Sequence, residues 1–261
     1  MSEPLALYEL RPPAAVITLN RPDKRNALSR GLIAALTDAF LRAADDAQAR
    51  CVILTGAGSV FCAGMDLAEL ADSVHHSETP ASVWDDALRL AALYEFIYGL
   101  PKPTVAAVNG SAVAGGAGLV TVCDLAVAAV EARFGYPEVR RGLVAAMVMP
   151  HLLRHVGERV GRYLLLTGEL IDAAEAARCG LVNAVVPAAE VTIRAAAWAR
   201  ALAEGGPQAL RATKDLLKRF SRQALSVEDA GRASAAPRLS DECRAGLEAF
   251  FAKRPVPWAP R

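Results

Sequence analysis

A run of 21 residues without a charged side chain, residues 103–123, limits the fold more than any other segment. The run is long enough to cross a membrane as a helix. It also contains four glycines between residues 110 and 118, and it ends directly at Asp124. Because glycines at this density break regular structure, we reject a membrane span. We predict instead a buried strand over Thr104–Val108, a tight turn over 109–118 and a short buried helix over 119–123.

Short β-branched segments alternate with helical patterns before residue 130. We predict strands over residues 14–20, 50–55 and 125–129, and helices over 30–44 and 84–98. Ser29 is suited to cap the first of these helices. The strand at 50–55 is apolar throughout, which is typical of a sheet that βαβ units cover on both faces. Residues 71–83 are polar and include Pro80, so we expect an irregular, mobile segment there.

The character of the chain changes after Pro150, where helical patterns dominate. We predict helices over residues 151–156, 161–166, 173–178, 188–203, 207–220 and 240–252, and one strand over 184–186. The chain therefore divides into an α/β part, residues 1–204, and a helical C-terminal part, residues 205–261.

Composition argues against several classes of protein. The net charge is only +1 and no block of like charges stands out, so nothing indicates a nucleic-acid partner. Five cysteines are scattered without C-x-x-C spacing, which argues against a disulfide framework or a zinc site. No targeting segment is visible at the N-terminus. We therefore expect a cytoplasmic protein without a bound metal, a nucleic-acid partner or a membrane partner.

Two glycine-containing turns each follow a predicted strand and open a predicted helix. One is residues 61–67 (FCAGMDL) and the other is residues 109–118 (NGSAVAGGAG). The second turn lacks the Lys-Ser/Thr pair of a P-loop and the last glycine of a dinucleotide-binding fingerprint. A helix start still offers unpaired N–H groups to an anion, and two such groups would form an oxyanion hole. Taken alone, the second turn fits a close-packing hinge equally well.

Glu138 follows Pro137 in a largely apolar stretch, residues 134–138 (FGYPE). Burial raises the pKa of a carboxyl group toward the range that proton transfer at neutral pH requires. Glu138 is therefore a candidate general acid or base. Taken alone, the pattern is more typical of a surface glutamate that caps the next turn.

The order and spacing of eight segments resemble the enoyl-CoA hydratase/isomerase (crotonase) family over nearly the whole chain. Each segment is weak evidence by itself. The segments are residues 20–28 (NRPDKRNAL), 61–67 (FCAGMDL), 107–116 (AVNGSAVAGG), 123–124 (CD), 134–138 (FGYPE), 166–168 (LTG), 180–182 (GLV) and 250–254 (FFAKR).

The resemblance implies a fold and a set of site residues. The fold would be a crotonase-like α/β spiral of ββα turns with a helical C-terminal trimerisation region, in a homotrimer or hexamer. The N–H groups of Met65 and Gly115 would bind the thioester oxygen, and Glu138 would be the catalytic acid or base. The substrate is an acyl-CoA, and no separate cofactor is implied. The implied CoA-binding set is Arg25, Ala27, Ala63, Asp66, Leu67 and Gly116, with Phe250 and Lys253 reaching the CoA of a neighbouring subunit.

Gly118 departs from the family pattern. Hydratases with two catalytic acids carry their first glutamate at this position, so the resemblance implies a site with a single glutamate. Family members of that kind include hydratases and double-bond isomerases. We therefore expect an enoyl-CoA hydratase, with a Δ3-Δ2 enoyl-CoA isomerase as the alternative. A non-catalytic CoA- or RNA-binding member of the fold is a third hypothesis.

Overall fold

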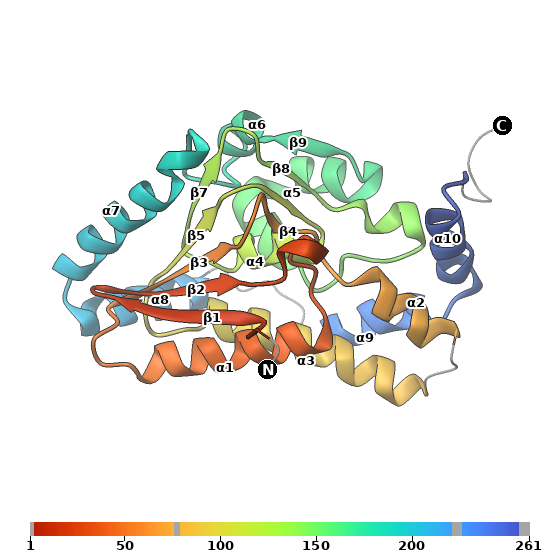
Figure 1. Ribbon diagram of the computed structural model, residues 1–261, viewed down its shortest axis with the longest axis horizontal. Helices are drawn as coiled ribbons and strands as arrows, with labels where there is room; N and C mark the ends of the chain where they lie inside the picture. The colour runs from red at the N-terminus through yellow and green to blue at the C-terminus, as the bar shows by residue number, and fades with distance from the viewer. Residues whose placement is uncertain (1–2, 76–78, 221–225, 256–261) are drawn as a thin grey trace.

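Two mixed sheets form the body of the computed structural model, which describes residues 3–75, 79–220 and 226–255 (Figure 1). The larger sheet has the order β1 (Ala6–Arg11), β2 (Ala14–Leu19), β3 (Cys51–Gly56), β5 (Thr104–Val108), β7 (Leu125–Ala129), β10 (Ala184–Val186). The smaller sheet has the order β4 (Val60–Cys62), β6 (Ser111–Val113), β8 (Arg133–Gly135), β9 (Leu170–Asp172). Only β1–β2 and β8–β9 are antiparallel pairs among the described strands.

Successive pairs of strands share one pattern. In β3/β4, β5/β6 and β7/β8, the first strand joins the larger sheet and the second joins the smaller sheet. Helical segments follow each pair: α2 (Leu67–His75) and α3 (Pro80–Tyr98), then α4 (Gly115–Thr121), then the 3-10 helix Pro137–Arg141 and α5 (Met149–Thr167). The chain therefore winds as a spiral of ββα turns, which confirms the predicted architecture.

Helices cover both faces of the larger sheet. On one face, α7 (Val191–Glu204) packs its alanines against alternate residues of the strands, among them Ile53 and Val105. On the other face, the intervening strand residues join the main core with α1 (Arg30–Asp45), α3 and α4. Both faces are thus apolar, which explains the unbroken apolar run of β3.

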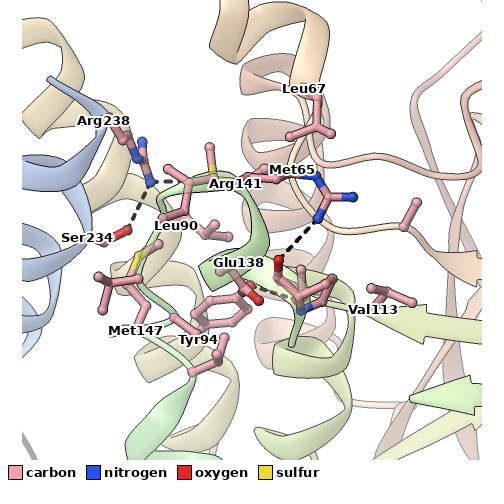
Figure 2. A pocket seen from close by; sticks show the side chains of 18 residues that line it. Met65, Leu67, Leu90, Tyr94, Val113, Glu138, Arg141, Met147, Ser234 and Arg238 are labelled. Atoms are coloured by element: carbon pink, nitrogen blue, oxygen red, sulfur yellow. Dashed lines mark hydrogen bonds between the residues drawn. The ribbon is translucent and has the colours of Figure 1, made fainter. Parts of the chain in front are cut away.

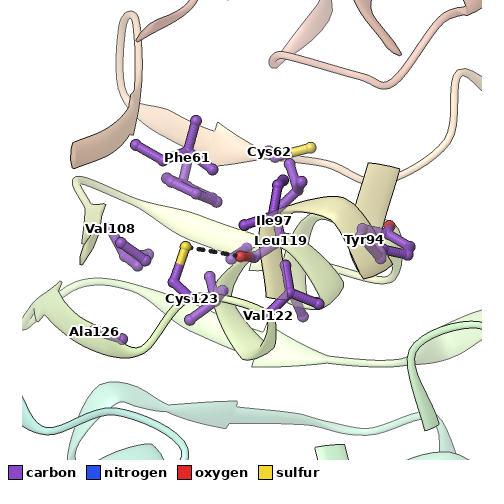
Figure 3. Packing of buried hydrophobic residues seen from close by; sticks show 14 of the residues in the cluster. Phe61, Cys62, Tyr94, Ile97, Val108, Leu119, Val122, Cys123 and Ala126 are labelled. Carbon is purple, nitrogen blue, oxygen red and sulfur yellow. Dashed lines mark hydrogen bonds between the residues drawn. The ribbon is translucent and has the colours of Figure 1, made fainter. Parts of the chain in front are cut away.

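The main core lies where α3 and α4 meet the strands (Figure 3). Phe61, Tyr94 and Leu119 are fully buried there. Cys123 Sγ lies 3.3 Å from the carbonyl oxygen of Leu119, one turn earlier on the same segment. The glycine-rich start of α4 is therefore held inside the core rather than at the surface.

The remaining helices are α6 (Ala173–Arg178), α8 (Pro207–Phe220), α9 (Val227–Arg238) and α10 (Asp241–Phe251), and a further 3-10 turn spans Ala188–Glu190. α10 lies at the edge of the molecule, at the right in Figure 1. α9, which sequence patterns did not predict, packs along α3. The division at residue 205 stays a prediction, although α9 lies against the α/β body.

The expected irregular segment at 71–83 is wrong for most of its residues. α2 continues through His75 and α3 starts at Pro80; residues 76–78 lie outside the described part of the chain. Thr79 caps α3 by accepting a hydrogen bond from the Ser82 N–H, and proline is well suited to the first helical position. The polar residues of this segment therefore belong to the C-terminal end of α2 and the N-terminal end of α3.

Several other boundaries differ from the prediction. The predicted helices at 151–156 and 161–166 are parts of one segment, α5, with a kink at Gly157. The strands β1, β4, β6, β8 and β9 had no clear pattern of their own, because β4, β6, β8 and β9 are only three residues long and β1 lies at the edge of its sheet. The predicted α1 is confirmed, since Ser29 Oγ accepts a hydrogen bond from Leu32 N at 3.1 Å.

The predicted strand over Thr104–Val108 is confirmed as β5. The predicted turn over 109–118 is wrong in part, because it contains β6 and the start of α4, which spans Gly115–Thr121 rather than 119–123. Among the described helices, none combines the length and the hydropathy that a transmembrane segment requires.

Asn26 connects, through its side chain, the turn at residues 21–26 with the turn at residues 57–60. Its side chain is fully buried. Its Nδ2 donates to the carbonyl oxygens of Ala57 and Val60 at 2.9 and 2.8 Å, and its Oδ1 accepts from Arg21 N at 2.9 Å. Its backbone has φ +53°, a conformation that asparagine tolerates better than most residues.

Replacing Asn26 with alanine should destabilise the fold strongly. The two carbonyl groups would lose their buried donors, at a cost of about 2–4 kcal/mol in the free energy of unfolding. Denaturant unfolding at a fixed protein concentration measures the effect. Asn20→Ala is the matched control, because Asn20 Nδ2 donates to Pro4 O in a solvent-exposed position, and we expect less than about 1 kcal/mol there. Equal effects of the two substitutions would contradict the role of Asn26.

Candidate active site

Three neighbouring parallel strands of the smaller sheet bring the predicted catalytic residues together. β4 pairs with β6 and β6 pairs with β8, all in parallel. Met65 follows the carboxyl end of β4, Gly115 follows β6, and Glu138 follows β8. The carboxyl ends of parallel strands open at one edge of a sheet, which is where ligands bind in α/β proteins. All three residues line one cavity (Figure 2).

The two glycine turns are in contact. A Cβ atom on Gly64 would lie 2.8 Å from the Ala114 Cβ and 3.3 Å from the Gly115 nitrogen. Gly64 itself has φ +88°, which glycine adopts without strain. A side chain at residue 64 would therefore push the two turns apart, which explains sterically why residue 64 is a glycine.

The N–H groups of Met65 and Gly115 donate no hydrogen bond within the described part of the chain. The neighbours of Met65 are bonded: Leu28 N donates to Gly64 O, and Asp66 N donates to Leu28 O. Gly115 is the first residue of α4, so its N–H points out of the helix start. Backbone N–H groups without partners are rare inside a protein, and two of them at one cavity have the donor pattern that an oxyanion hole requires, so the predicted oxyanion hole stays a prediction.

Ala114 precedes the second donor in a strained conformation, with φ +53° and ψ −124°. Residues other than glycine adopt such angles only when their surroundings enforce them. The Ala114 N–H donates to Gly135 O at 2.8 Å and so anchors this turn to the end of β8. The strained residue therefore sets the backbone direction at the start of α4, directly before Gly115, which lines the cavity.

Glu138 lies in the 3-10 helix Pro137–Arg141 and reaches into the same cavity. Its Oε2 is shielded from solvent and has no hydrogen-bond partner among the described residues. Burial raises the pKa of Glu138 to about 7, and its own backbone N–H and the Arg141 guanidinium oppose that rise. A carboxyl group with such a pKa can both accept and return a proton near neutral pH. The surface capping role that sequence alone favoured is therefore wrong.

The cavity has a volume of about 90 Å³, and most of its wall is apolar. Its polar groups are few: Glu138 and Arg141 on one side, and Ser234 and Arg238 on α9. The lining residues are Ala63, Met65, Leu67, Leu90, Tyr94, Val113, Ala114, Gly115, Pro137, Glu138, Arg141, Leu143, Val144, Ala145, Met147, Val148, Ser234 and Arg238.

Tyr94 fills the space beside Gly118, where a first glutamate would project. A Cβ on Gly118 would overlap Val148 Cγ1 and would lie 3.0 Å from Tyr94 Oη. Tyr94 Oη in turn donates to Gly115 O at 2.7 Å. A glutamate therefore does not fit at residue 118 unless Tyr94 and Val148 move, and Glu138 is the only carboxyl group among the residues that line this cavity.

The predicted CoA-binding residues fall into two groups. Ala63 and Leu67 line the cavity, whereas Asp66 forms an ion pair with Arg21 at 3.0 Å beside it. Arg25 and Ala27 lie on the adjoining turn, where Arg25 O accepts from Ala63 N at 3.0 Å. Only Ala63 and Leu67 of this set are therefore in the cavity wall, and the contact of all five residues with CoA stays a prediction.

Gly116, Phe250 and Lys253 lie elsewhere. Gly116 is buried, and a Cβ there would overlap the carbonyl oxygen of Cys62, so close packing explains this glycine. Phe250 is on α10, where the Arg141 guanidinium lies 4.7 Å from its ring centre. Lys253 is exposed just after α10. The predicted roles of these three residues toward CoA are not tested by their positions.

Sequence patterns missed Arg141, Ser234 and Arg238. Arg141 follows Glu138 by three residues, and its positive charge lowers the pKa of that carboxyl group. This spacing could have indicated from the sequence that Arg141 lies beside Glu138. Ser234 and Arg238 belong to α9, which carries few large apolar residues, and no local signal connects them with the distant turns.

Comparisons with known proteins agree with this geometry. The profile of the enoyl-CoA hydratase/isomerase family matches residues 12–261. A Thermus thermophilus relative named as a candidate enoyl-CoA hydratase is 44% identical over 92% of this chain and 95% of its own length. The 2,3-dehydroadipyl-CoA hydratase of Escherichia coli is 34% identical over 92% of each chain. A crystal structure of an enoyl-CoA hydratase/isomerase from Xanthobacter autotrophicus superposes with a TM-score of 0.85 at 30% identity, covering 96% of this chain and 97% of the other.

Adding one methyl group at Gly118 should test the packing that excludes the first glutamate. Gly118→Ala would force its Cβ against Val148, so we expect a loss of about 1–3 kcal/mol in the free energy of unfolding. Val148→Ala removes the overlapping Cγ1 atom. The double variant should therefore be more stable than the sum of the two single losses implies, by a coupling of at least about 0.5 kcal/mol. Additive losses in denaturant unfolding would show that Val148 does not set this limit.

Proposed function

The chain belongs to the enoyl-CoA hydratase/isomerase family, and we propose that it is an enoyl-CoA hydratase that adds water across the 2,3 double bond of an acyl-CoA thioester. One observation carries the proposal: a glutamate with a buried carboxyl oxygen and two N–H groups that have no partner among the described residues line the same cavity, at the ends of three adjacent parallel strands. The two N–H groups are suited to stabilise a developing oxyanion, and the glutamate is suited to carry a proton.

The proposed reaction uses Glu138 twice. The thioester oxygen accepts hydrogen bonds from the N–H groups of Met65 and Gly115, which favours electron flow from C3–C2 toward that oxygen. The Glu138 carboxylate takes a proton from water while the water oxygen bonds to C3. The resulting enolate collapses as protonated Glu138 gives that proton to C2. The carboxylate is then restored, and one water has been added.

A Δ3-Δ2 enoyl-CoA isomerase is the second candidate. The observation that favours it is the packing of Tyr94 and Val148 against Gly118, which leaves no second acid to hold the attacking water. In that reaction Glu138 would take a proton from C2 and return it to C4, through the same enolate. The two activities therefore share the oxyanion hole and differ only in whether water enters.

CoA binding and assembly form part of the proposal. The CoA moiety would lie across the turns that carry Arg25, Ala27, Ala63, Asp66 and Leu67, with no separate cofactor. We also propose a homotrimer or hexamer, in which Phe250 and Lys253 approach the CoA of a neighbouring subunit. The support is an apolar groove along α5, where Leu166 is 71% exposed, because exposed apolar patches of this kind are usually covered in an assembly.

Product analysis in heavy water distinguishes the candidates. We expect the enzyme to convert crotonyl-CoA to a 3-hydroxyacyl-CoA with one deuterium at C2, which mass spectrometry detects. Glu138→Gln should lower the rate about 1000-fold or more, because no other carboxyl group of the described residues lines the cavity. Glu131→Gln, at an exposed position outside the cavity, is the matched control.

Other outcomes would contradict the hydratase proposal. Conversion of a 3-enoyl-CoA to the 2-enoyl isomer without added water would favour the isomerase. No turnover of either substrate would favour a non-catalytic binding role. Activity of Glu138→Gln near the wild-type level would show that another group carries the proton.

The pH dependence of hydration should follow Glu138. The carboxylate form must accept the proton from water, and burial raises the pKa of Glu138 to about 7. We therefore expect kcat/KM to be about tenfold lower at pH 6 than on its plateau above pH 8, since about a tenth of the groups are ionised at pH 6. An ordinary glutamate would leave the rate flat over this range. A flat profile from pH 5.5 to 8 would contradict the assignment.

A further inference from the structure

Arg238 is a buried cation in the wall of the cavity. It lies at the end of α9 and only 4% of its surface is exposed. Its Nη2 donates to Ser234 Oγ at 3.1 Å and approaches Met65 Sδ at 3.4 Å. Both partners are neutral. Within the described residues, its Nη1 and Nε donate no hydrogen bond.

No carboxylate of the described residues lies within ion-pair distance of Arg238. Asp86 is the acid that acts on it electrostatically, but that carboxylate already pairs with Arg30 at 2.6 Å. Burial lowers the pKa of Arg238 only to about 10, so the group stays charged at neutral pH. A buried cation that no carboxylate of the described residues contacts directly is costly, so an anionic ligand is a suitable partner for Arg238.

The cavity offers that ligand a defined place. Figure 2 shows Arg238 and Ser234 at one end, Glu138 in the middle and Val113 at the other end. The side chains of Leu90, Met147 and Tyr94 also line the cavity and give it a largely apolar wall. An acyl chain that starts at the Met65 and Gly115 N–H groups would thus pass apolar side chains and end at a cation.

We propose that Arg238 binds a carboxylate at the far end of the acyl group, so that the preferred substrates are thioesters of short unsaturated dicarboxylic acids. The inference rests on the proposed function, since it places the thioester at Met65 and Gly115. The arginine fork suits a carboxylate, because two N–H groups can donate to its two oxygens. The Ser234 hydroxyl holds the fork in position through Nη2.

An uncharged acyl chain of equal length would leave the cation without a partner. Sites built to bond a polar group reject the analogue that lacks it more strongly than apolar sites discriminate by size. Arg238 is therefore a specificity-determining residue in this proposal rather than a participant in proton transfer.

Binding of saturated thioesters tests the inference without requiring turnover. We would titrate the protein with glutaryl-CoA and adipyl-CoA, and with pentanoyl-CoA and hexanoyl-CoA as uncharged analogues of the same carbon number, in a calorimeter. We expect at least one of the two dicarboxylic thioesters to bind tenfold or more tightly than its analogue. Equal or weaker binding of both would overturn the proposal, whether or not the protein hydrates any enoyl-CoA.

Substitutions at Arg238 assign the preference to this residue. Arg238→Gln should reduce the preference below about threefold while hexanoyl-CoA still binds, and Arg238→Lys should retain part of it because the charge remains. Arg232→Gln is the matched control, since Arg232 is on the same helix but is exposed and pairs with Glu228. Unchanged preference in Arg238→Gln would overturn the proposal.

Two further readouts separate this inference from the proposed function and from misfolding. Failure to hydrate any 2-enoyl-CoA, together with a tenfold preference for a dicarboxylic thioester, would contradict only the hydratase. Hydration of crotonyl-CoA without any preference would contradict only the role of Arg238. If Arg238→Gln also loses hexanoyl-CoA binding, Ser234→Ala and Arg238→Lys replace it as test variants. An unchanged preference for the dicarboxylic thioester in both of these variants would overturn the proposal.

Discussion

The parallel pairing of β4, β6 and β8 is the constraint on which the site depends. Each strand is only three residues long, so it contributes little binding surface itself. What it supplies is direction: three chain segments leave one sheet edge side by side, and each turns at once into a helical segment. Met65, Gly115 and Glu138 are thus gathered from positions far apart in the sequence. The strands that precede β4, β6 and β8, namely β3, β5 and β7, are neighbours in the larger sheet, which helices cover on both faces.

The local parts of this arrangement were predictable because their causes are local. Gly64 adopts a positive φ of +88° in a turn between a strand and a helix, and Ser29 caps a helix within its own segment. Glu138 follows a proline in an apolar stretch, which marks it as a candidate, but its burial depends on walls supplied by other segments. The sequence alone therefore favoured a surface role for it, and only the resemblance to a family assigned it to catalysis.

The parts that were missed depend on tertiary packing. α9 has a weak helical pattern with many small residues, and it is stabilised by its contact with α3 rather than by its own composition. Arg238 is therefore unremarkable in the sequence and unusual only in the fold. Gly118 is a similar case: the sequence shows that an acid is absent, but Tyr94 and Val148, which fill the space, come from other elements.

In a site with one carboxyl group, burial must raise the pKa of that group, whereas in a site with two carboxyl groups each can raise the pKa of the other. A neighbouring carboxylate raises the pKa of its partner by repulsion, and no such neighbour lines this cavity. Glu138 instead loses its hydration, and the nearby Arg141 keeps the pKa from rising further. The charged and neutral forms then have similar free energies near pH 7, so the same group can accept a proton from water and release it to carbon. Tyr94 and Val148, which fill the space beside Gly118, line the same cavity as Glu138, so the side chains that leave no room for a second acid also form part of the wall around the single carboxyl group.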